Sequence, residues 1–118
     1  METLMGQTAE TFIKQNIPEE NILRSMANFY SIFSDSTRVK ILMALSISEM
    51  CVGDVAQILN LNQSTLSHQL KLLRDAKIID CRREGKIIYY FNINPFINDI
   101  MLTGIDNLDN ENGDYKFA

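Results

Sequence analysis

The spacing of apolar residues along this chain changes near Lys77 from a helical repeat to an alternating one, and this change limits the folds that the chain can adopt. Before it, Leu66, Leu70 and Leu73 recur at a spacing that places them on one face of a helix. After it, apolar residues alternate over residues 87–93, which is the pattern of a half-buried strand. The sequence therefore predicts a helix that is followed at once by a β-hairpin.

A second short helix precedes this one. Its apolar face is formed by Val52, Val55, Ala56 and Leu59. Asn60 can end that helix in the left-handed conformation, and Asn62 or Ser64 can cap the next helix. Between the strands, Gly85 supplies the positive φ that a tight hairpin turn needs. Two helices, a tight turn and a hairpin together make a winged helix-turn-helix.

The chain of 118 residues has the length of one domain. We expect a mainly α fold with a small β-hairpin, in the order α-α-α-α-α-β-β-α. Asp35 and Asn94 are the expected N-caps of the third helix and the last helix. The expected segments of this single domain (1–118) are an N-terminal helix or arm (1–18), helices over 19–33 and 35–46, the helix-turn-helix (51–76), the wing (78–93), a last helix (94–106) and an acidic tail (107–118).

Charge is distributed unevenly along the chain. The net charge is −4, which by itself argues against a polyanionic partner. Residues 62–92, however, hold six Lys or Arg against three Asp or Glu, a net charge of +3, so the rest of the chain carries −7. A locally basic face on an acidic body still binds phosphate, and the acidic body discourages promiscuous binding.

Composition also excludes several classes of protein. No apolar run approaches the roughly 18 residues of a membrane span, and the first residues do not resemble a secretory signal. Cys51 and Cys81 do not suggest a disulfide framework, so we expect free thiols and a cytoplasmic protein. The chain has one histidine and no glycine-rich phosphate loop, nucleophile elbow or evident carboxylate pair, which argues against an enzyme.

Four segments together resemble the arsenic-repressor (ArsR/SmtB) family of bacterial winged-helix repressors. They are FSDSTRVKILMAL (33–45), EMCVGDVAQIL (49–59), STLSHQLKLLRDAKII (64–79) and REGKIIYYFN (83–92). The resemblance implies a homodimer whose first and last helices pack across a two-fold axis, which would make 94–106 a dimerisation helix. It also implies a repressor that leaves its operator when an inducer binds.

We expect the second helix of the helix-turn-helix to enter the major groove of double-stranded DNA with its first two turns against base edges. The candidate contacts in those turns are Gln63, Ser64, Thr65, Ser67 and His68. Gln63 can pair bidentately with adenine, while Lys71 and Arg74 lie farther along and would hold phosphates. On the wing, the expected contacts to phosphate or the minor groove are Arg82, Arg83 and Lys86. The alternative is a surface helix that is polar by chance, and for His68 a solvent histidine.

The resemblance also defines what a metal site would need. Metal-responsive members of the family use a Cys-x-Cys pair at the start of the helix-turn-helix, where this chain has Cys51 but Gly53. A second family site uses Asp and His on the last helix, where this chain has Asp99 but Met101. Soft metals prefer three or four Cys or His ligands placed together. We therefore expect no cofactor and disfavour a metal ion, and a metal-responsive repressor with a non-standard site stays an alternative.

Cys51 is the candidate thiol sensor. It lies near the N-terminus of a short helix, where partial positive charge favours the thiolate. Oxidation or persulfidation there would alter the helix-turn-helix directly. The alternative, a small buried core thiol, is the one that the residue type favours.

The sequence therefore predicts a sequence-specific DNA-binding transcriptional repressor that releases its operator on inducer binding or thiol modification. A winged-helix protein-interaction module without DNA binding is the alternative, since the chain is acidic and the region of Tyr89 and Tyr90 can lie exposed. The operator, the inducer and the regulated genes do not follow from the sequence.

Overall fold

The computed structural model describes residues 3–4 and 7–112. Contacts group the chain into two compact units, residues 1–32 and residues 33–118. Each unit is described by itself below.

The N-terminal unit holds two short strands and two helices. Strands β1 (Thr3–Leu4) and β2 (Gln7–Thr8) pair antiparallel and lead into helix α1 (Ala9–Asn16). Thr8 caps α1, because its side chain accepts a hydrogen bond of 3.2 Å from the backbone N–H of Thr11. Helix α2 (Glu20–Ser31) follows, and neither helix has a buried residue. The helices agree with the sequence prediction, whereas the strand pair was not predicted.

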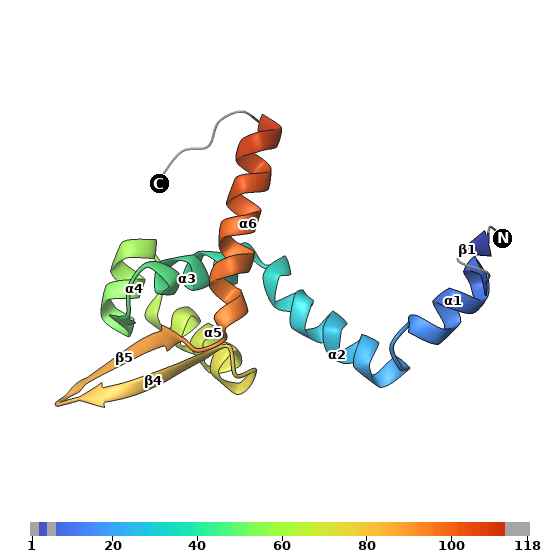
Figure 1. Ribbon diagram of the computed structural model, residues 1–118. Helices are drawn as coiled ribbons and strands as arrows, with labels where there is room; N and C mark the ends of the chain where they lie inside the picture. The colour runs from blue at the N-terminus through green and yellow to red at the C-terminus, as the bar shows by residue number, and fades with distance from the viewer. Residues whose placement is uncertain (1–2, 5–6, 113–118) are drawn as a thin grey trace. The chain divides into compact units, whose positions relative to one another are not determined.

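The second unit begins within a short 3-10 turn, η1 (Ile32–Ser34), and is mainly helical (Figure 1). Its helices are α3 (Ser36–Ile47), α4 (Val52–Leu59), α5 (Gln63–Asp75) and α6 (Pro95–Asn112). The predicted caps are confirmed: Asp35 accepts from the N–H of Arg38 at 3.1 Å, and Asn62 accepts from the N–H of Ser64 at 2.8 Å. Asn60 ends α4 in the left-handed conformation with φ of +54°.

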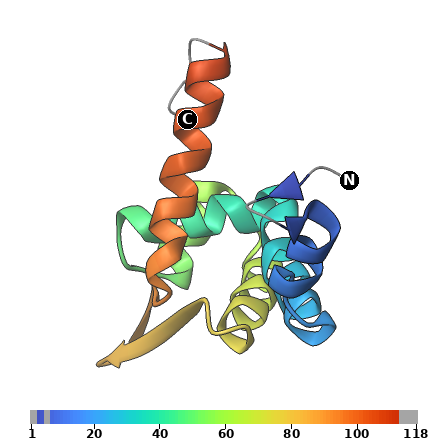
Figure 2. The same cartoon turned by 45° about the vertical axis from the view of Figure 1, so that its right-hand side comes forward.

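A three-stranded antiparallel sheet, in the order β3-β5-β4, completes this unit. Its strands are β3 (Met50–Cys51), β4 (Ile79–Glu84) and β5 (Ile87–Asn92). The sequence predicted the β4–β5 hairpin, and Gly85 turns it with φ of +63°. It missed β3, since two residues directly before a helix carry no alternating pattern. Figures 1 and 2 show the hairpin projecting from the helices of this unit.

The core of the second unit lies between its helices and the base of the hairpin. Its fully buried side chains are Ile41, Leu42, Val55, Leu66, Leu70, Leu73, Ile78, Ile79 and Ile97. Three of them belong to α5 and are the inward face predicted from its period. Burial of this face turns the opposite face of α5 towards solvent, and the site is built on that face.

The last helix is longer than the sequence indicated. Asn94 caps it as predicted, accepting from the N–H of Phe96 at 3.0 Å, but the helix continues to Asn112. The prediction of a helix end at 106 and a tail from 107 was therefore wrong over 107–112, and residues 113–118 lie outside the described residues. The acidic composition suggested a tail, yet residues 105–112 contain no proline or glycine that would end the helix.

Candidate nucleic-acid interface

The exposed face of α5 begins at the N-terminus of the helix. Gln63, Ser64, Thr65, Ser67 and His68 are all exposed. They occupy the first two turns of α5, where Leu66 takes the buried position between Thr65 and Ser67. The five residues predicted to meet base edges are thus brought together on one accessible surface.

A half-buried hydrogen bond connects α5 to α3. Arg38 of α3 donates from Nε to Oε1 of Gln69 at 2.9 Å, and Gln69 lies next to His68 on α5. Arg38 also lies 3.9 Å from Asp35, the residue that caps its own helix. The helix that carries the polar face is therefore tied to α3 by a directional contact as well as by packing.

A groove of about 330 Å³ lies between α5 and strand β5. Its lining residues are Ser67, Leu70, Lys71, Arg74, Asp75 and Tyr90. Lys71 makes no ion pair among the residues that the structure describes, whereas Arg74 pairs with Asp80 of β4 at 3.2 Å. The sequence did not place Tyr90 in this site, although its position in the alternation of β5 was the available signal.

The wing presents two more exposed cations near its turn. Arg83 donates from Nε to the carbonyl oxygen of Gly85 at 2.9 Å, so its stem lies over the turn. Lys86 is exposed at the start of the returning strand. These two predicted wing residues are free to approach a polyanion.

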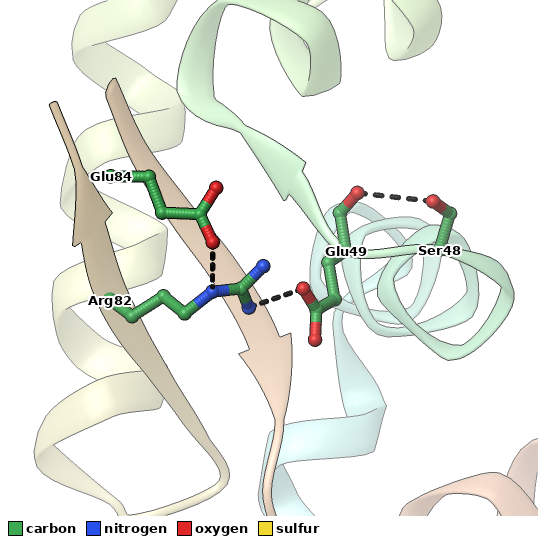
Figure 3. Close-up of polar contacts among 4 residues, drawn as sticks. All are labelled: Ser48, Glu49, Arg82 and Glu84. Carbon is green, nitrogen blue, oxygen red and sulfur yellow. Dashed lines mark hydrogen bonds and ion pairs between the residues drawn. The ribbon is translucent and has the colours of Figure 1, made fainter. Parts of the chain in front are cut away.

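Arg82 stands apart from the other wing cations. Its guanidinium forms ion pairs with Glu49, directly before β3, and with Glu84, two residues along β4, the latter at 3.1 Å (Figure 3). It also lies 5.4 Å from the ring centroid of Tyr89 and 5.7 Å from that of Phe91. Hydrogen bonds to Glu49 and then to Glu84 raise the pKa of Arg82, so the group stays cationic.

Comparison with known proteins agrees with this geometry. A model of the family described as "Bacterial regulatory protein, arsR family" matches residues 35–80, which span α3 to the start of β4. The cadmium resistance transcriptional regulatory protein CadC of Listeria innocua serovar 6a is 37% identical over 83 residues, covering 70% of each chain. This chain belongs to the arsR family of bacterial regulatory proteins. As a member, it is a DNA-binding transcriptional repressor of the winged helix-turn-helix type.

Two solved structures share the fold of this arsR-family chain. The transcriptional repressor PagR of Bacillus anthracis is 31% identical, with a TM-score of 0.63 over 72% of this chain and 98% of that one. The homodimeric winged helix-turn-helix DNA-binding domain Mb0332 of Mycobacterium bovis has a TM-score of 0.69 at 20% identity, covering 98% of this chain and 100% of that one. Both confirm the predicted fold class.

The two cysteines of this arsR-family chain lie on different strands of the sheet. Cys51 pairs with Tyr89 across β3 and β5 and also occupies the N-cap position of α4, where its side chain makes no capping hydrogen bond. Cys81 pairs with Tyr90 across β4 and β5. Both thiols are free and half-buried. Since β5 separates them, their Cα atoms lie roughly 9–10 Å apart by strand spacing, beyond the about 7 Å that a disulfide tolerates.

Over the described ranges, 3–4 and 7–112, no group of three or more His, Cys, Asp or Glu side chains is arranged to hold a metal ion. In the same part of the chain, no helix combines the length and the apolar character needed to cross a membrane.

Proposed function

We propose that this arsR-family chain is a homodimeric repressor that binds operator DNA with α5 and the β4–β5 wing. The observation that carries the proposal is the polar face of α5, which lies exposed beside a groove lined in part by Lys71 and Arg74. In a helix-turn-helix protein, the second helix places such a face in the major groove. The role is therefore binding to duplex DNA in the cytoplasm, with no catalytic step.

The exposed residues divide into two groups by the chemistry of their contacts. Gln63, Ser67 and His68 can donate to and accept from base edges, so we assign specificity to them together with Ser64 and Thr65. Lys71, Arg83 and Lys86 are cations without a carboxylate partner in the described structure, and we assign phosphate contacts to them. Tyr90 joins this second group, because its side chain lines the groove beside Lys71.

Dimerisation through α6 is supported by its exposed apolar side chains. Leu102 and Leu108 are 61% and 56% exposed, and the C-terminal part of α6 extends beyond the other helices of this unit in Figures 1 and 2. Exposed leucines on a protruding helix favour burial against a second copy. A two-fold axis would then present two α5 helices to DNA about one helical turn apart.

The signal that releases the operator is assigned to the thiol of Cys51. Its position at the start of α4 means that a modified sulfur would disturb the first helix of the helix-turn-helix. CadC, the relative above, is named for cadmium resistance, so a metal ion is the competing signal. This chain has Gly53 at the position of the second family cysteine, which is why we place the thiol first.

A mobility-shift titration with the DNA upstream of the chain's own gene tests the proposal. At one fixed salt concentration, that fragment and a shuffled fragment of equal length are titrated with the full chain. We expect the upstream fragment to bind at least about a thousandfold more tightly, the lower range for specific regulators. Equal binding of both fragments would contradict sequence-specific recognition, and binding of neither fragment would favour the protein-interaction module without DNA binding.

A further inference from the structure

Arg82 occupies the face of the hairpin that is opposite to the α5 groove. Tyr90 lines that groove, and its cross-strand partner on β4 is Cys81. Side chains alternate along a strand, so Tyr89 and its partner Arg82 point to the other face. Of the wing cations, Arg82 is the one whose position in the register directs it away from the recognition helix.

On that face, Arg82 spans the sheet from one edge to the other. It starts on β4 and passes the rings of Tyr89 and Phe91 on β5. Its guanidinium then reaches Glu49, directly before β3 (Figure 3). Since β3 leads straight into α4, this side chain connects the outer strand of the wing to the entry of the helix-turn-helix.

The charges around Arg82 also disfavour contact with DNA. Two carboxylates, Glu49 and Glu84, face one guanidinium, which leaves the cluster with a net charge of −1. A DNA phosphate would have to displace one carboxylate and approach the other. Lys86 and Arg83 have no such carboxylate in the described structure and remain available to phosphate.

We propose that Arg82 is a positioning residue: clamped by Glu49 and Glu84 over the rings of β5, it fixes the wing to the helix-turn-helix and makes no phosphate contact. This inference rests on the proposed function, because positioning matters only if the wing meets DNA. It replaces the phosphate contact that the sequence alone suggested for Arg82.

Removing one carboxylate distinguishes a positioning residue from a phosphate contact, because the two roles predict opposite changes in DNA affinity. The variant Glu49→Gln deletes a negative charge near DNA, which would strengthen binding if Arg82 were a phosphate contact released by the change. If Arg82 positions the wing, the same variant weakens binding of the upstream duplex by about two- to fivefold, the range expected of an exposed ion pair. The matched control is Asp54→Asn, which deletes an equal charge from an exposed site on α4 without weakening binding.

The salt dependence of affinity provides the second criterion. Affinity for the upstream duplex is measured by fluorescence anisotropy between about 50 and 200 mM salt. Arg83→Gln, which removes a phosphate contact, makes the slope of log affinity against log salt concentration shallower by about 0.9. Arg82→Gln keeps the wild-type slope. The double variant Glu49→Gln/Arg82→Gln binds no worse than the weaker single variant. A slope loss for Arg82→Gln equal to that of Arg83→Gln, or tighter binding by Glu49→Gln, overturns the inference.

Hydrogen exchange of the DNA-free chain keeps this test separate from the proposed function. Amides of β4 and β5 exchange faster in Glu49→Gln and Arg82→Gln than in the wild type, and at the wild-type rate in Asp54→Asn. If neither the wild type nor any variant binds the duplex, the proposed function fails. The exchange rates still show whether the contact of Arg82 with Glu49 and Glu84 stabilises the wing. Unchanged exchange in both clamp variants would overturn the positioning role.

Discussion

Arg38 and Gln69, thirty-one positions apart in the sequence, meet in a hydrogen bond of 2.9 Å between Nε and Oε1. The bond connects α3 to α5 one residue away from His68, which lies on the exposed face of the same helix. A helix that packs only through leucines can rotate by a few degrees at low cost, whereas a directional bond limits that rotation. The polar face therefore depends on a contact made on the opposite side of α5.

Replacing Gln69 with leucine tests this contact. Gln69→Leu keeps the side-chain volume but leaves a half-buried guanidinium without its acceptor, so we expect the free energy of unfolding to fall by about 1 kcal/mol. Urea denaturation measures the change. Gln57→Leu, at an exposed glutamine of α4, is the control and stays within about 0.5 kcal/mol of the wild type. Equal stability of the two variants would show that the hydrogen bond does not contribute.

Two leucines of α5 test which face of the helix is buried. Leu70 is 1% exposed and Leu72 is 41% exposed, so the same substitution has different costs at the two positions. We expect Leu70→Ala to lower the free energy of unfolding by about 2–5 kcal/mol and Leu72→Ala by less than about 1 kcal/mol. Chemical denaturation measures the free energy of unfolding of both variants. A larger loss at Leu72 would mean that α5 is rotated relative to the structure.

The thiol proposal predicts a response that depends on one cysteine. Cys51→Ser retains a good N-cap residue for α4, so the variant folds and binds the operator. We expect peroxide or polysulfide to release the wild type and the control Cys81→Ser from DNA, while Cys51→Ser stays bound. Anisotropy of labelled operator follows the release. Normal release of Cys51→Ser would assign the signal elsewhere, and release of every variant by a metal ion would favour a metal sensor.

Local signals in the sequence were sufficient for the framework of the second unit. The period of Leu66, Leu70 and Leu73, the caps at Asp35 and Asn62, and the glycine of the hairpin each act over a few residues. A pattern of that range is visible in the sequence because neighbouring positions determine it. The same signals predicted the exposed residues of α5, since the face opposite a buried one follows from geometry.

Contacts between distant segments were not predictable in this way. Strand β3 is two residues long and exists through its pairing with Tyr89 and Tyr90. The role of Arg82 depends on Glu49, which lies far away in the sequence and close in the folded sheet. Composition misled the prediction over residues 107–112, because an acidic segment is compatible with helix as well as with a tail.

A comparison of Gln63→Ala with Lys71→Ala on operator and shuffled duplexes tests the central claim, that α5 contacts base edges with its first turns and phosphates farther along. The affinity ratio between the two duplexes is measured for the wild type and both variants over a series of salt concentrations. The account predicts that Gln63→Ala lowers this ratio by about 5- to 150-fold, which corresponds to about 1–3 kcal/mol of discrimination, without changing the salt slope. It predicts that Lys71→Ala weakens both complexes equally and makes the slope shallower by about 0.9. An unchanged ratio for Gln63→Ala together with an unchanged slope for Lys71→Ala would contradict the account.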